Sequence, residues 1–177
     1  MSKCLIIGYG NPDREDDGVA WHILKKLAQH FDLGHPDELV ETIADLDLGQ
    51  PQLRDDKPDL LGELQLMPEI AETLAAYDRV CFVDAHTGAY AQEINVTPIQ
   101  AEYQSSPFTH HMTAETCLAL AKSAFGRAPD GMVISVRGYK FGFEPALSPM
   151  TAALAAETVE KIKSWLQESL SSANPHA

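Results

Sequence analysis

Short apolar runs alternate along this chain with segments of helical period, and this alternation limits the folds that are open to it. The first run, residues 3–9, stops at the turn sequence Gly8-Tyr9-Gly10-Asn11, which is typical of a buried parallel strand. The clearest run, residues 79–84, is almost wholly apolar and ends in a carboxylate. We expect strands at residues 3–9, 39–44, 79–84, 93–99 and 132–136, and helices near residues 19–31, 68–75, 114–125 and 149–170.

Strands that alternate with helices predict a mostly parallel sheet that is covered on both faces. We therefore expect an α/β protein, a three-layer α/β/α sandwich around a twisted sheet of about five strands. The 177 residues contain no internal repeat or linker, so we expect one domain over residues 1–170 and a frayed tail at 171–177. Residues 45–65 form a long connection, which favours a functional or locally mobile segment.

The composition excludes several kinds of partner. A formal net charge of −13 argues against nucleic acid and against an anionic membrane surface, because both need clustered Lys and Arg. No apolar stretch approaches the roughly 18 residues that span a membrane, and the N-terminal run is too short for a signal peptide. The three cysteines lie far apart in apolar stretches, which is typical of reduced, buried thiols. We expect a cytoplasmic protein.

Carboxylates follow two of the expected strands. The first strand leads into residues 13–17 (DREDD), and the run at 79–84 ends in Asp84. Because the carboxyl ends of parallel strands meet at one edge of a sheet, these side chains are expected to be neighbours. Asp16 and Asp17 also precede the first helix, so either could cap it and leave the other as a ligand. Asp84 follows four apolar residues, where an unpaired carboxylate would be costly to bury, and this favours a site role.

Histidines supply a third kind of candidate ligand. His110 and His111 lie just before the expected helix at 114–125, on the side of the fold where strand-to-helix loops gather. A single histidine is more often structural, and the tandem pair leaves both interpretations open. His86 follows Asp84 and is a further candidate beside it. Two carboxylates and one imidazole suit a divalent ion such as nickel or zinc, with positions left for a substrate.

Competing motifs are weaker. The sequence Gly8-Tyr9-Gly10 follows a strand as in the dinucleotide-binding pattern GxGxxG, but Asp13 occupies the third glycine position. Acidic residues there would repel a pyrophosphate, so we expect no nucleotide cofactor. The sequence contains neither the GxSxG pattern of serine hydrolases nor the HExxH pattern of zinc proteases.

Three motifs together resemble a known family. Residues 6–19 (IIGYGNPDREDDGV) resemble the opening of the nickel–iron hydrogenase maturation endopeptidases, in which a strand precedes the pattern G-N-x-x-x-x-D-[DE]-G. The resemblance continues through residues 82–85 (FVDA) and 109–112 (THHM), in the order of the family, and covers most of the chain. A D-G-G-T-x-G element that many members carry after the second strand is absent from residues 45–65.

The resemblance implies a site and a reaction. By position, the metal-binding residues of the family correspond to Asp17, Asp84 and His110, with Asp17 and Asp84 catalytic; the alternates are Asp16, His111 and His86. The implied function is removal of the C-terminal extension from the precursor of a nickel–iron hydrogenase large subunit after nickel insertion, by a monomeric protein. The nickel would come with the substrate.

Two questions stay open at this point. Hydrolysis could be metal-assisted, or an aspartate could act as the general base while the metal serves as a checkpoint. The alternative function is that of a non-catalytic metal-binding chaperone with the same fold.

Overall fold

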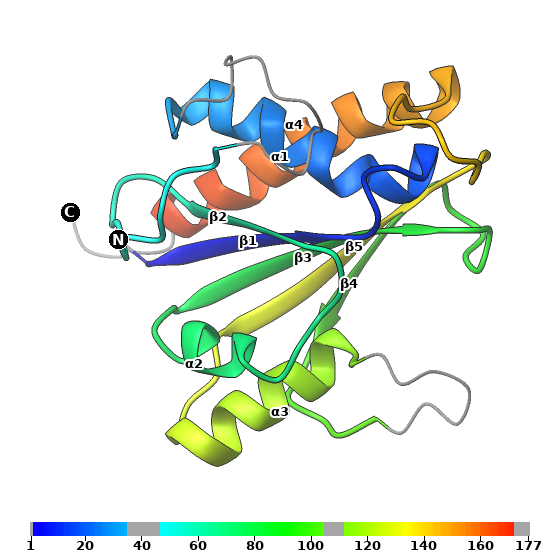
Figure 1. Cartoon of the computed structure of the whole chain (residues 1–177). Helices are drawn as coiled ribbons and strands as arrows, with labels where there is room; N and C mark the ends of the chain where they lie inside the picture. The colour runs from blue at the N-terminus through cyan, green and yellow to red at the C-terminus, as the bar shows by residue number, and fades with distance from the viewer. Residues whose placement is uncertain (1, 35–46, 105–111, 172–177) are drawn as a thin grey trace.

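The computed structural model describes residues 2–34, 47–104 and 112–171, and in these residues it has one five-stranded sheet (Figure 1). The strands are β1 (Cys4–Tyr9), β2 (Asp59–Glu63), β3 (Arg79–His86), β4 (Ile94–Ile99) and β5 (Asp130–Arg137). Their spatial order is β2-β1-β3-β5-β4, and every neighbouring pair is parallel except β4 with β5. The mostly parallel sheet predicted from the sequence is confirmed.

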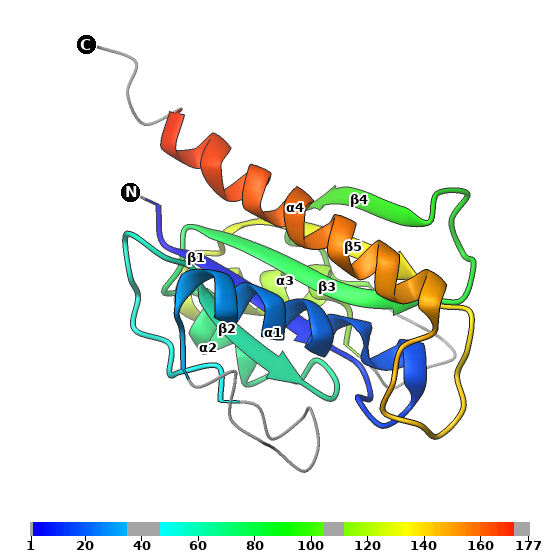
Figure 2. The same ribbon diagram turned by 90° about the horizontal axis from the view of Figure 1, so that it is seen from above.

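Helices cover both faces of this sheet, as Figures 1 and 2 show. Helices α1 (Val19–Phe31) and α4 (Pro149–Ser171) lie side by side on one face, and α2 (Ile70–Leu74) and α3 (Ala114–Phe125) cover the other. This is the expected three-layer α/β/α sandwich. Within the described residues, no helix is long and apolar enough to cross a membrane.

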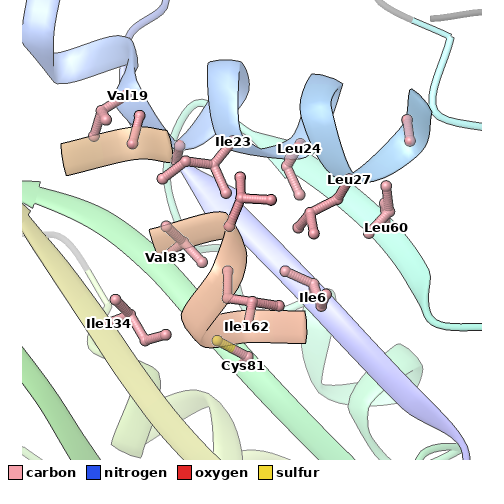
Figure 3. Close-up of a cluster of buried hydrophobic side chains, with 14 of the residues drawn as sticks. Ile6, Val19, Ile23, Leu24, Leu27, Leu60, Cys81, Val83, Ile134 and Ile162 are labelled. Atoms are coloured by element: carbon pink, nitrogen blue, oxygen red, sulfur yellow. The ribbon is translucent and has the colours of Figure 1, made fainter. Parts of the chain in front are cut away.

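The apolar sides of α1 and α4 form one core with the sheet. The backbone of β1 lies so close to α1 that a Cβ on Gly8 would come within 2.8 Å of the Leu24 side chain. A glycine is therefore needed for the helix to pack at this distance. Figure 3 shows the buried side chains of this core, which include Ile6, Val19, Ile23, Leu24, Leu27, Leu60, Cys81, Val83, Ile134 and Ile162.

Helix starts follow the sequence signals. The hydroxyl of Thr113 accepts a hydrogen bond from the Thr116 amide and so caps α3, as expected. At α4, Pro149 is the first helical residue, and the Ser148 hydroxyl accepts a bond from the Thr151 amide. These caps satisfy amides that have no partner inside the helix.

The second strand is where the sequence interpretation was wrong. Strand β2 lies inside residues 45–65, which we expected to be a connection, and pairs in parallel with β1. It begins with a buried acid, Asp59, so the strand does not stand out as an apolar run in the sequence. That carboxylate accepts hydrogen bonds from the Tyr77 hydroxyl (2.7 Å), the Arg54 guanidinium (2.7 Å) and the Leu53 amide (2.8 Å). The strand predicted at residues 39–44 lies outside the described residues.

Candidate active site

The carboxyl ends of the parallel strands carry the acidic residues, at the edge on the right of Figure 1. After β1, the chain makes a tight turn through a short 3₁₀ helix, η1 (Glu15–Gly18), which packs against β3. Asp84 lies near the end of β3. The expected convergence of the first turn on the end of β3 is therefore present.

Asp84 is held by donors from both neighbouring strands. The hydroxyl of Ser135 on β5 donates to its Oδ1 at 2.5 Å, and the hydroxyl of Tyr9 on β1 donates to its Oδ2 at 3.1 Å. Within the described residues each oxygen thus accepts one bond and keeps a lone pair for another donor. The two hydroxyls fix the orientation of the carboxylate without neutralising its charge.

Burial raises the pKa of Asp84 to about 6, although the bonds from Ser135 and Tyr9 act to lower it. The negative charges of Asp17 and Glu115 raise it further. The same carboxylate, together with burial, raises the pKa of the Tyr9 hydroxyl, so this tyrosine remains a hydrogen-bond donor. A carboxyl group whose pKa lies near neutrality, in a polar pocket, is suited to general acid–base work.

Asp17 is half-buried and lies within electrostatic range of Asp84. Its Oδ2 accepts a hydrogen bond from the Asn11 amide at 3.0 Å. The turn that carries it closes tightly: Gly10 has a φ of +135°, and a Cβ there would stand 2.2 Å from the Asp17 carbonyl oxygen. Gly10 and Asn11 therefore shape the turn that presents Asp17, which gives a physical reason for that part of the motif.

Asp16 has a different role. It is fully buried and accepts four hydrogen bonds: from the amides of Tyr139 (2.8 Å), Lys140 (2.9 Å) and Ser148 (2.7 Å), and from the Ser148 hydroxyl (2.8 Å). Burial acts to raise the pKa of Asp16, but these donors lower it below its ordinary value. Asp16 therefore anchors the segment between β5 and α4 to the first turn.

Asp16 is an alternate ligand by sequence, and in the structure both of its carboxylate oxygens accept hydrogen bonds from residues 139–148. The expected helix capping is not seen, since the N-cap residues of η1 and α1, Arg14 and Gly18, make no side-chain hydrogen bond to their helices. Asp17 is the less buried carboxylate of the pair.

A pocket of about 390 Å³ opens beside Asp84, on the sheet face that α3 covers. The sheet contributes Tyr9, Asp84, Asn95 and Ser135 to its lining, and the start of α3 contributes Glu115. Gln104 and Met112, the described residues on either side of the gap at 105–111, also line it. A chain segment in extended form could lie here against Asp84.

Glu115 is a residue that the sequence interpretation missed. It lies in the first turn of α3, lines the pocket and acts by its charge on both Asp84 and Tyr9. The sequence offered one usable signal, an acid two residues after the N-cap Thr113, but that pattern is usual at helix starts and points to no site by itself.

The predicted histidines divide into two groups. His86 is buried on β3, where its Nδ1 accepts a hydrogen bond from the Gly88 amide at 3.1 Å. His110 and His111 lie outside the described residues. Across the residues that are described, no three His, Cys, Asp or Glu side chains come together as a metal site. Asp17 and Asp84 would thus need further ligands from elsewhere in the chain or from a substrate.

Comparison with known proteins gives the fold a class. No protein-family model and no curated protein matches the sequence. Among solved structures, the hydrogenase maturating endopeptidase HybD from E. coli matches with a TM-score of 0.66 and 18% identity, over 94% of this chain and 93% of that one. The [NiFe] hydrogenase maturation protease HycI from Thermococcus kodakarensis KOD1 matches with a TM-score of 0.61 and 22% identity, over 94% and 93%.

A third structure, the hydrogenase 2 maturation peptidase from Thaumarchaeota archaeon SCGC_AB-539-E09, matches with a TM-score of 0.59 and 19% identity, over 93% of this chain and 98% of that one. The chain thus has the fold of these maturation proteases over almost its whole length. The fold implied by the three sequence motifs is confirmed.

Proposed function

We propose that this chain is a hydrogenase maturation endopeptidase, which removes the C-terminal extension from the precursor of a nickel–iron hydrogenase large subunit. The observation that carries the proposal is Asp84, which lines a pocket in this fold, has a pKa of about 6 and is acted on by the charge of Asp17. The sequence motifs and the fold of the matched proteases support the same function.

The substrate's nickel is the feature that the site recognises in this proposal. Asp17 supplies a carboxylate oxygen and His110 an imidazole nitrogen, with His111 as its neighbour, while Asp84 stays unligated as the base. His110 enters this proposal through the sequence resemblance. Oxygen and nitrogen donors suit a borderline divalent ion.

Asp84 is the general base of the proposed hydrolysis. With a pKa of about 6 it is mostly ionised at neutral pH, yet basic enough to take a proton from water. The resulting hydroxide attacks the scissile carbonyl carbon, and Asp84 then returns the proton to the leaving amine. Tyr9 and Ser135 hold the carboxylate in place during both transfers. The metal that arrives with the substrate polarises the scissile carbonyl.

The test is a processing assay with matched aspartate variants. Purified protein is incubated with nickel-loaded and with nickel-free precursor from the same organism, and the precursor mass is measured. We expect shortening of the nickel-loaded precursor only, and none with Asp17→Asn or Asp84→Asn. Asp13→Asn is the control, because Asp13 is an exposed acid in the same turn.

Full processing by either the Asp17 or the Asp84 variant would remove that residue from the proposed site. Cleavage of nickel-free precursor would contradict the metal recognition. The second candidate function, a metal-binding chaperone, is favoured by the open carboxylate pair alone; it requires that the wild-type protein bind the nickel-loaded precursor and leave its mass unchanged.

A further inference from the structure

Beyond Asp84, the strands β3 and β5 carry a second polar row that the proposed hydrolysis does not use. His86 on β3 and Arg137 on β5 are register partners. They stand two residues beyond Asp84 and Ser135, which are also register partners. Side chains two apart on a strand share a face, about 7 Å apart, so this row continues the polar floor of the pocket.

His86 offers a donor that lacks an acceptor. The side chain is 7% exposed, and its Nδ1 accepts the Gly88 amide hydrogen. In the neutral ring the proton must then lie on Nε2. That Nε2 is buried and has no hydrogen-bond partner in the described part of the chain. Buried donors are almost always paired, and this Nε2–H has a free position for an acceptor from a bound molecule.

Arg137 offers a second donor of the same kind. Its Nε is buried without a partner among the described residues, and none of their carboxylates forms an ion pair with its guanidinium. The Glu93 carboxylate, whose backbone carbonyl accepts from the Arg137 amide, is hydrogen-bonded by the Tyr139 hydroxyl. The guanidinium lies 5.3 Å from the centre of the Tyr139 ring. No described carboxylate pairs with the Arg137 guanidinium, so its positive charge can bind an anion.

Gly88 organises both donors. Its amide sets the His86 tautomer, and its missing side chain makes room for Arg137, because a Cβ there would stand 2.4 Å from the guanidinium Nη1. Its φ of +100° is also a conformation that favours glycine. Tyr90 joins the row to the pocket, since its ring stacks edge-on against His86 at 5.0 Å and also lines the pocket beside Asp84.

We propose that His86 and Arg137 form a carboxylate-binding subsite that holds the peptide for cleavage at Asp84. A carboxylate is the anion that a peptide carries, and it can accept from the imidazole Nε2–H and from the guanidinium together. The carboxylate comes from an acidic side chain of the extension or from its C-terminus. This inference rests on the proposed endopeptidase function.

The first experiment measures kcat and KM for three forms of the nickel-loaded precursor. One has the natural extension, one has its acidic residues changed to Asn and Gln, and one has a C-terminal amide. The enzymes are wild type, Arg137→Met, Arg137→Lys and the control Lys140→Met. Lys140 is an exposed cation three residues away, so its loss removes the same charge without the fork geometry of Arg137.

Loss of hydrogen bonds to a charged group predicts a KM about tenfold higher for Arg137→Met on the natural precursor. The Arg137→Lys variant should give a smaller rise, and Lys140→Met should match wild type. One of the two altered precursors lacks the carboxylate that binds. With that precursor the wild-type KM should rise to the value of Arg137→Met, and this shows whether the carboxylate is a side chain or the C-terminus. An Arg137→Met effect that is equal on all three precursors, or below twofold, overturns the subsite.

A second experiment measures carboxylate binding at the subsite without any cleavage. Protein labelled with ¹⁵N-arginine is titrated with acetylglycine and with acetylglycinamide, and the Nε–H signal of Arg137 is followed by NMR. We expect a saturable shift with acetylglycine only, and its disappearance in His86→Phe would show that both donors take part. No shift with acetylglycine overturns the subsite even if cleavage is observed. A wild-type protein that shifts but never cleaves would contradict the endopeptidase proposal alone.

Discussion

Asp16 and Asp17 are adjacent in sequence, yet their carboxylates have different environments. Successive residues of a tight helical turn point in different directions, and here only Asp16 points fully into the protein. Asp16 is fully buried under four donors, whereas Asp17 is half-buried and accepts one amide hydrogen. The acidic pair of the motif is therefore one anchoring residue followed by one residue that the proposed function places in the site.

The matched variants Asp16→Asn and Asp17→Asn should separate these roles. In Asp16→Asn, an amide NH₂ faces donors that had a charged acceptor, so the free energy of unfolding should fall by about 3 kcal/mol or more. In Asp17→Asn, it should change by less than about 1 kcal/mol, while precursor processing is lost. Urea unfolding and the processing assay measure both. Equal loss of stability in the two variants would contradict the division.

Asp84 should make the folded protein less stable as the pH rises through its titration range. Its folded pKa of about 6 lies above the ordinary value of 3.8, so the folded state holds the proton more tightly than the unfolded state does. The free energy of unfolding should therefore fall between about pH 4 and 6, by about 3 kcal/mol from this group.

The variant Asp84→Asn removes this titration. At pH 7 it should be more stable than wild type by about 1–3 kcal/mol, and its unfolding free energy should no longer fall over that pH range on account of this residue. Urea unfolding of both proteins at several pH values gives the difference curve. If the difference in unfolding free energy between the two proteins did not change with pH, the pKa of Asp84 would not be raised by folding.

At the scale of elements, the turn between β1 and α1 depends on one glycine. A Cβ on Gly10 would meet the Asp17 carbonyl oxygen at 2.2 Å, and φ is +135°. Gly10→Ala should therefore displace the turn that presents Asp17, with a loss of about 3 kcal/mol in unfolding free energy and most of the processing activity.

Gly126 provides the matched control for that substitution. It also has a positive φ, +79°, at the end of α3, but nothing lies within 4 Å of a Cβ placed there. Gly126→Ala should cost only the backbone term of about 1–2 kcal/mol and leave processing intact. Thermal melts and the mass assay test both variants. Similar activity loss in the two would show that the turn has no special role.

The elements that could be predicted from sequence are those whose signal is local. The apolar run of β3, the cap at Thr113 and the Ser148-Pro149 start of α4 each follow from neighbouring residues, and the structure confirms them. Strand β2 was not predicted because only two strongly apolar residues follow Asp59. The burial of Asp59 depends on hydrogen bonds from Tyr77 and Arg54, which are not visible as a local pattern.

The candidate site divides in the same way. Asp84 could be predicted because a carboxylate at the end of a buried strand is visible in the sequence. The separate roles of Asp16 and Asp17 could not, since they depend on donors more than 120 residues away. The role of Glu115 near Asp84 could not be predicted for the same reason. Its relation to Asp84 arises only when α3 packs on the sheet.

At the scale of the whole molecule, two carboxylates from separate elements raise the pKa of a third, that of Asp84. Asp84 comes from β3, Asp17 from the turn after β1, and Glu115 from α3. Glu115→Gln removes one negative charge, so the pKa of Asp84 should fall. In the proposed mechanism the base form of Asp84 is the active one, so the acidic limb of the kcat/KM profile should move to lower pH.

The control for this prediction is Glu72→Gln, an exposed acid on the neighbouring helix α2. It removes the same charge at a position that has no resolved effect on Asp84. The two pH profiles, measured with nickel-loaded precursor, should differ in the position of the acidic limb. A limb that stays in place in Glu115→Gln, or moves to higher pH, would contradict Asp84 as the base.

The hydrogen bonds to Asp16 can form only late in the synthesis of the chain. Its donors belong to residues 139–148, in the last quarter of the chain, while the turn that they hold is made first on the ribosome. Until that late segment has left the exit tunnel, the nascent chain carries an acidic turn with no anchor. The turn that presents Asp17 therefore reaches its anchored form only when synthesis of the chain is almost complete.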